Sequence, residues 1–191
     1  MFGSLDEVLE FVKANNHTEG RSYEYKKGLP WDNNNKDFQY KLIKTILSMS
    51  NLRDGGYIII GVEKNDYGKY EIMGMADYCV GTYEQEKVLE AANVYADPYV
   101  DIDLKVFKTE KNNSIVVIKV FEFAQVPVIC KHNYERILEQ GRIYTRTFRK
   151  PESTATISSS DLREIIDLAL EKESTRIKMY SFTFFPDAAI S

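Results

Sequence analysis

Three glutamates and one lysine in this chain have the types and spacing for chemistry on a phosphodiester. Glu19 and Glu24 flank the start of a short strand, Lys26 follows Glu24 on the same strand face, and Glu63 ends a later strand. If the two strands are neighbours, three like charges meet, which disfavours the ionised forms unless a cation neutralises them. Clustered carboxylates suit Mg²⁺ or Mn²⁺, which can activate a water and stabilise charge on a phosphate. On spacing alone, the alternative is that these are surface acids drawn from the 29 in the chain.

A second group of residues has the pattern of a nucleic-acid contact. Guanidinium groups pair with phosphates, and an aromatic ring between them can stack on an unpaired base. The candidate residues are Arg142, Tyr144, Arg146, Arg149 and Lys150, with Phe148 among them, and nearby Lys131, His132 and Arg136 extend the patch. The first three alternate, so we expect them on one face of a strand. The alternative is a solvated strand and loop, because Glu135, Glu139 and Glu152 dilute the positive charge.

The third acid is positioned by a paired glycine that opens an apolar run at residues 55–63. We expect one strand at 57–63, with Tyr57, Ile59, Gly61 and Glu63 on one face and room beside the acid at Gly61. The G-x-x-x-x-G spacing also fits the start of a phosphate-binding loop. That loop requires Lys and Ser/Thr next, where this chain has Val62 and Glu63, so we reject nucleotide hydrolysis by a P-loop.

The order of the remaining elements predicts an α+β fold, with a mixed or antiparallel sheet and flanking helices. Apolar periodicity and caps indicate helices at 4–16, 36–52, 83–95 and 160–172. Strands are expected at 22–27, 57–63, 69–73, 100–109, 114–121, 126–130 and 142–147. We expect one domain at 1–173, then an aromatic tail at 174–191 that forms a packing strand or starts a further region.

Composition narrows the class of protein. The chain has 191 residues, enough for one domain with a real core, and its net charge of −4 excludes a uniformly basic nucleic-acid coat. Two cysteines without a CxxC pair and two histidines cannot supply a zinc-finger ligand set. The 13 tyrosines suit stacking roles or half-buried strand positions. The chain lacks the run of ~18 apolar residues that a membrane helix needs. Its N-terminus is acidic, unlike a signal or transit peptide, so we expect a soluble, cytoplasmic protein.

Three segments together resemble a known family. They are Glu-Gly-Arg-Ser-Tyr-Glu-Tyr-Lys at 19–26, Ser50-Asn51 leading to Gly-Gly-Tyr-Ile-Ile-Ile-Gly-Val-Glu at 55–63, and Gly-Arg-Ile-Tyr-Thr-Arg at 141–146, followed by Thr154-Ala155 and a closing helix. In these segments the chain resembles the Alba-like DNA-binding domain of Schlafen proteins and many bacterial proteins. The resemblance spans residues 19–170.

In the Schlafen members that cut RNA, the resemblance implies a three-carboxylate site holding a divalent metal, and Glu19, Glu24 and Glu63 fall on its positions. It therefore implies a metal-dependent endoribonuclease, a hydrolase acting on structured RNA such as tRNA, in which Lys26 assists at the phosphate. The third acid is Asp in those members, and the loop after Asn51 is longer here. Two alternatives remain open. One is a non-catalytic DNA-binding or regulatory module of a larger protein. The other is an interaction domain whose Phe182–Phe185 segment docks on a partner or forms a homodimer.

Overall fold

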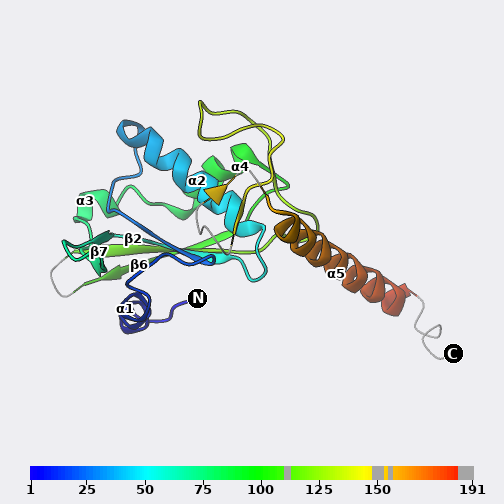
Figure 1. The fold of residues 1–191 in the computed structure, drawn as a ribbon, viewed down its shortest axis with the longest axis horizontal. Coiled ribbons are helices and arrows are strands. Elements are labelled where there is room, and N and C mark those ends of the chain that lie inside the picture. Colours follow the sequence, from blue (N-terminus) through cyan, green and yellow to red (C-terminus); the bar gives the residue numbers. More distant parts are fainter. Residues whose placement is uncertain (110–112, 148–152, 155–156, 185–191) are drawn as a thin grey trace.

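A mixed four-stranded sheet forms the centre of the computed structural model, which describes residues 1–109, 113–147, 153–154 and 157–184. The strand order is β1 (Tyr23–Lys26), β2 (Gly56–Ile60), β7 (Ser114–Val120) and β6 (Ile102–Lys108). β1 runs parallel to β2, and the other two pairings are antiparallel. With helices on both faces, this confirms the α+β class and the mixed sheet (Figure 1).

The two central strands contain continuous apolar runs, at 58–60 and 115–118, because both of their faces are covered there. In β7, Val116, Ile118 and Val120 enter the core under α2 (Lys36–Ser50) and α4 (Gln85–Tyr95). Ile115 and Val117 point to the other face and enter a second core, which α1 (Leu5–Ala14) closes. Figure 1 shows α1 and α2 on opposite sides of the sheet.

The N-terminal helix begins as its sequence predicts. The Ser4 hydroxyl accepts a hydrogen bond from the Glu7 backbone N–H at 3.3 Å. The Glu7 carboxylate accepts from the Gly3 N–H at 2.8 Å, one residue before the cap position that a capping box uses. Val8 and Val12 then face the second core.

The strand expected at 57–63 is divided, and this changes the candidate site. β2 ends at Ile60 and β3 (Val62–Lys64) begins after Gly61, whose φ of 102° turns the chain. Two backbone N–H groups, of Met73 and Gly74, donate to the Gly61 carbonyl and hold this turn. β3 pairs with β4 (Tyr70–Ile72) in a separate hairpin. The prediction that Glu63 shares a face with Tyr57 and Ile59 is therefore wrong.

Several small elements complete the fold. They are η1 (Asn33–Asn35), α3 (Asp77–Val80), β5 (Ala96–Asp97) paired with β8 (Ile129–Cys130), and β9 (Thr145–Arg146) paired with β10 (Ser153–Thr154). The hairpin at 62–72 and the helix at 85–95 confirm the sequence prediction.

The last helix is longer than expected. α5 (Ser159–Phe184) extends away from the sheet (Figure 1), so residues 174–184 continue a helix and do not form the packing strand, which was one of the two alternatives expected for this segment. The phenylalanines favour a strand, but Glu173 and Arg176 form an ion pair along the helix at 2.6 Å, and such pairs support helix propagation. Phe185 lies outside the described residues, as do Phe148, Arg149 and Lys150. Across the described ranges, no helix combines the length and apolar character needed to cross a membrane.

Candidate nucleic-acid site

A pocket of about 380 Å³ lies between β1, α2 and the loop that carries Arg136. Its lining contains two of the three predicted acids and the predicted lysine, together with residues from α2 and the loop: Glu19, Glu24, Lys26, Lys41, Lys44, Thr45, Arg136 and Ile137. β1 explains part of this arrangement, because alternate side chains of a strand point to opposite faces. Tyr23 and Tyr25 pack in the second core under α1, whereas Glu24 and Lys26 line the pocket.

Glu24 lies at the bottom of the pocket, with only 5% of its surface exposed. One carboxylate oxygen pairs with Lys26 and the other with Arg146. The Thr45 hydroxyl donates a further hydrogen bond to the second oxygen at 3.2 Å. A buried carboxylate needs such compensation for its lost hydration, and here two cations and a hydroxyl provide it.

Arg146 is buried, which corrects the expectation that it faces solvent with Arg142 and Tyr144. Its guanidinium has no exposed surface, pairs with Glu24, and donates to the Gly20 carbonyl at 3.0 Å. Tyr144 is also buried, and its hydroxyl accepts from the Glu139 N–H at 2.7 Å. Arg142 is exposed and pairs with Glu139 at 3.1 Å. The alternation is broken because β9 contains only Thr145–Arg146, so the preceding residues follow no strand.

Glu19 is the second acid in the pocket. One of its carboxylate oxygens accepts the Tyr25 backbone N–H at 3.0 Å, which fixes the side chain beside β1. Burial raises the pKa of Glu19, and the negative charge of Glu24 raises it further. The hydrogen bond from Tyr25 and the charges of Lys26 and Arg146 oppose this shift.

Glu63 is separated from the pocket by the break at Gly61. It lies on β3, about one third of its side chain is exposed, and it forms an ion pair with Lys27 at 3.3 Å. Among the described residues, no three His, Cys, Asp or Glu side chains lie together as metal ligands would. Because both oxygens of Glu24 already face cations, the three glutamates as arranged here do not fit a divalent metal.

The pocket also contains cations that the sequence reasoning did not select. Lys41 and Lys44 extend from α2, and Arg136 comes from the loop, so four cations including Lys26 face two carboxylates. Burial lowers the pKa of Lys44, whose ammonium lies 4.8 Å from the centre of the Tyr144 ring. The available signal was the pair of lysines three residues apart on α2, which places both on one side of the helix.

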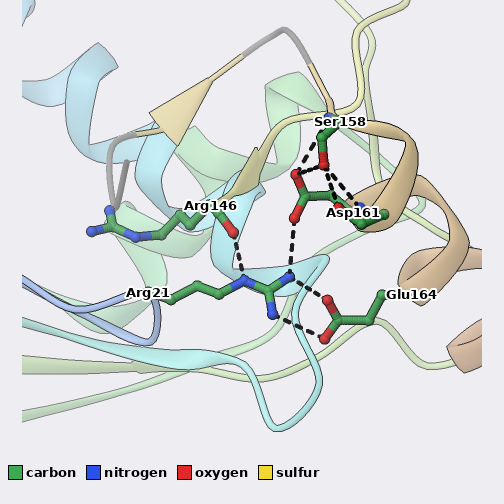
Figure 2. A network of polar contacts seen from close by, with 6 residues as sticks. Arg21, Arg146, Ser158, Asp161 and Glu164 are labelled. Carbon is green, nitrogen blue, oxygen red and sulfur yellow. Dashed lines mark hydrogen bonds and ion pairs between the residues drawn. The ribbon is translucent and has the colours of Figure 1, made fainter. Parts of the chain in front are cut away.

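A hydrogen-bonded network connects the bottom of the pocket to α5 (Figure 2). The Arg21 Nε donates to the Arg146 carbonyl at 2.6 Å. The two terminal nitrogens of Arg21 donate to the Glu164 carboxylate at 3.0 and 2.5 Å, and one of them lies 3.7 Å from Asp161. Asp161 in turn accepts from Ser158 at the start of the helix. Arg21 therefore joins the segment before β1, the segment around β9 and the first turns of α5.

The family model described as Schlafen, AlbA_2 matches residues 19–153, and the chain belongs to this family. This confirms the family resemblance of the segments at 19–26, 55–63 and 141–146. A comparison with curated proteins found no match.

Two solved structures share similarity with the chain. The crystal structure of the DIP2311 protein from Corynebacterium diphtheriae aligns with a TM-score of 0.49 and 16% identity, over 83% of this chain and 28% of that one. The present chain therefore spans little more than a quarter of that protein. The solution structure of the N-terminal domain of a protein from Nitrosomonas europaea, named as related to the ATP-dependent DNA helicase RecG, aligns with a TM-score of 0.48 and 18% identity. That alignment covers 83% of this chain and 97% of that domain.

Proposed function

We propose that this domain binds nucleic acid, and that the pocket cations Lys41, Lys44 and Arg136 hold its phosphates. The observation that carries the proposal is the local charge. The protein has a net charge of −4, yet four cations and two carboxylates line this pocket. A chain that is acidic as a whole needs such a local patch to contact a phosphate backbone.

The roles of the pocket cations differ. Lys26 is engaged with Glu24, together with the buried Arg146, so these groups support the pocket. Within the described part of the chain, Lys41, Lys44 and Arg136 form no ion pair with an acid. Lys41 and Arg136 are exposed. These three cations can therefore exchange water and counterions for phosphate oxygens without breaking an ion pair with a described residue.

Partial burial gives Lys44 a particular sensitivity to a phosphate. Desolvation lowers the pKa of Lys44, which means that its charged form is poorly compensated in the free protein. An approaching phosphate supplies the missing negative charge. Binding should thus raise the pKa of Lys44 and depend on it more than on a fully hydrated lysine.

Metal-dependent cleavage of structured RNA such as tRNA is the finer function that the family resemblance implies. The contacts favour it less, because Glu24 is neutralised by Lys26 and Arg146 and because Glu63 lies on another hairpin. The geometry best supports a binding domain without chemistry, acting on its own or as the regulatory part of a larger protein.

Binding is tested by fluorescence anisotropy with labelled tRNA and with single- and double-stranded DNA over a range of salt. Lys41→Ala, Lys44→Ala and Arg136→Ala should each weaken binding to every ligand and reduce the slope of log K against log salt by about 0.7–0.9. Lys13→Ala is the matched control, because this exposed lysine lies on α1, on the opposite face of the sheet. If none of the nucleic acids binds at low salt, the proposal is overturned.

Cleavage is tested with the same RNAs incubated with Mn²⁺ or with EDTA. A binding domain leaves every substrate intact in both. Cutting that requires the metal and disappears in Glu19→Gln would overturn the binding-only function and assign a nuclease. Circular dichroism of each variant excludes loss of the fold as the cause.

A further inference from the structure

A row of aromatic side chains begins beside the pocket and crosses from α2 to α4. Tyr40 directly precedes Lys41 on α2, and its ring stacks on that of Tyr134 with centroids 3.2 Å apart and planes inclined by 18°. Tyr134 lies two residues before Arg136 on the loop. The stacked pair is therefore carried by the same two segments, α2 and the loop, that carry two of the cations proposed to hold phosphate.

The row continues along the end of α4, which lies beside α2 (Figure 1). The Tyr95 and Tyr40 rings are nearly perpendicular with centroids 5.6 Å apart, and the centroid of the His132 ring lies 6.3 Å from that of Tyr95. The Lys131 N–H donates to the Tyr95 carbonyl at 2.9 Å, which holds the start of the loop against α4. Both ends of the loop segment 131–136 thus carry a cation, with aromatic rings between them.

A second depression lies at the far end of this row. It has a volume of about 540 Å³, and its lining includes Lys131, His132, Asn93 and Tyr99. The Lys131 ammonium lies 5.3 Å from the centre of the Tyr99 ring, which is 75% exposed. A cation and an accessible aromatic face therefore lie together here. Glu90 on the rim is the acidic group that opposes them.

We propose that Tyr134, His132, Lys131 and Tyr99 form a path for single-stranded nucleic acid, which extends from the pocket to the second depression. Unpaired bases stack on the exposed ring faces, and the phosphates between them contact the cations at the two ends. A duplex satisfies its own stacking and offers no free base, so it can use the cations alone. The inference rests on the proposed function and adds to it the class of ligand, which is unpaired RNA or DNA.

The path predicts a dependence on ligand form and length. A single strand should bind more tightly than a duplex of the same length at equal salt. Among oligonucleotides of about 4, 8 and 16 nucleotides, affinity should increase with length until the strand fills both depressions. Further length should add no affinity. 2-Aminopurine placed in the strand should lose fluorescence on binding, because a base stacked on tyrosine is quenched.

Tyr99 provides the sharpest variant, because its exposed ring contributes little to the core. Tyr99→Ala should weaken a 16-nucleotide single strand by about tenfold and leave duplex binding unchanged, whereas Tyr99→Phe should bind normally because it keeps the stacking ring. Tyr67→Ala is the control, since Tyr67 is 88% exposed on the β3–β4 turn, away from the path. Lys131→Ala should weaken the long strand and not the shortest one.

The outcomes separate this inference from the proposed function. If Lys44→Ala weakens binding while Tyr99→Ala and Lys131→Ala do not, and a duplex binds as well as a single strand, the pocket binds nucleic acid and the path is refuted. If no nucleic acid binds the unmodified protein, both proposals fail together.

Discussion

Arg146 and Glu24 form a buried ion pair at the bottom of the pocket, although 122 residues separate them in the chain. The pair joins β9 to β1 and is completed by Lys26 and by the Gly20 carbonyl. It gives a basic residue near the pocket a supporting role, because its guanidinium is inaccessible and both of its terminal nitrogens donate to groups of the protein.

Replacing Arg146 should therefore act mainly on the free energy of unfolding and not directly on nucleic-acid binding. Arg146→Ala leaves Glu24 buried with one cation fewer, and the loss of one partner of a buried pair costs about 3–5 kcal/mol. Urea unfolding followed by circular dichroism measures this loss. The exposed Arg142→Ala serves as the control and should change the free energy of unfolding by less than about 0.5 kcal/mol. Equal midpoints for both variants would show that the pair does not support the fold.

Glu19 should make stability depend on pH in a defined direction. Its pKa is raised by burial and by Glu24, so the folded state holds a proton more tightly than the unfolded state. This contribution to stability is present in acid and declines as pH rises through the unfolded pKa of 4.5 towards the folded value.

Glu19→Gln removes this dependence and keeps an oxygen to accept the Tyr25 N–H. The variant should melt at a higher temperature than the unmodified protein at neutral pH, and the difference should vanish below pH 4.5. Thermal unfolding at a series of pH values measures the effect. A variant that is less stable at neutral pH would mean that the ionised carboxylate is favourable where it stands.

Gly61, directly before the β3–β4 hairpin, and Gly68, in the turn of that hairpin, offer a matched pair of variants. Gly61 has a φ of 102°, and a Cβ there would lie 3.1 Å from both the Gly74 Cα and an Ile115 methyl group. Gly68 has a φ of 73°, and a Cβ there would meet no atom within 4 Å. Gly68→Ala should therefore cost about 1 kcal/mol from backbone strain alone, and Gly61→Ala about 3 kcal/mol. Equal losses in urea unfolding would show that crowding at Gly61 has no effect.

The attachment of α5 can be measured with a double-mutant cycle on Arg21 and Glu164. These side chains form two parallel hydrogen bonds and are 15% and 33% exposed. Arg21→Ala and Glu164→Gln should show a coupling energy of about 1–2 kcal/mol. Arg53 and Glu171 have the same geometry on the same helix but are 46% and 58% exposed, so their coupling should be below about 1 kcal/mol. If the coupling energy of Arg21 and Glu164 is no larger than that of Arg53 and Glu171, the result contradicts a stabilising role for the network in Figure 2.

The elements that local patterns determine could be predicted from the sequence. The helix at Lys36–Ser50 follows from its apolar periodicity, and the hairpin around Gly68 follows from its turn residues. The break at Gly61 could not be placed, because it depends on the close approach of Gly74 and Ile115. A glycine inside a strand pattern indicates a bend, but only the fold shows that the bend separates two sheets.

The candidate site was also predicted only in part, because some of its contacts are local in sequence and others depend on the fold. Glu24 and Lys26 lie on one strand face, a local relation that alternation gives directly. The burial of Arg146 depends on a carboxylate far away in the chain, and an arginine near the surface and one in the core look the same in sequence. The contribution of Arg136 depends on how its loop packs against α2, which no local pattern specifies.

The matched family segment begins at residue 19, after α1, and this has a practical consequence for the protein. Val8 and Val12 of that helix cover Ile59 and Val117 on the sheet, with further aromatic packing between Phe11 and Tyr23. The family boundary therefore does not coincide with the boundary of the folding unit. A shortened protein that starts at residue 19 would present an apolar sheet face to water and would associate with itself through that face.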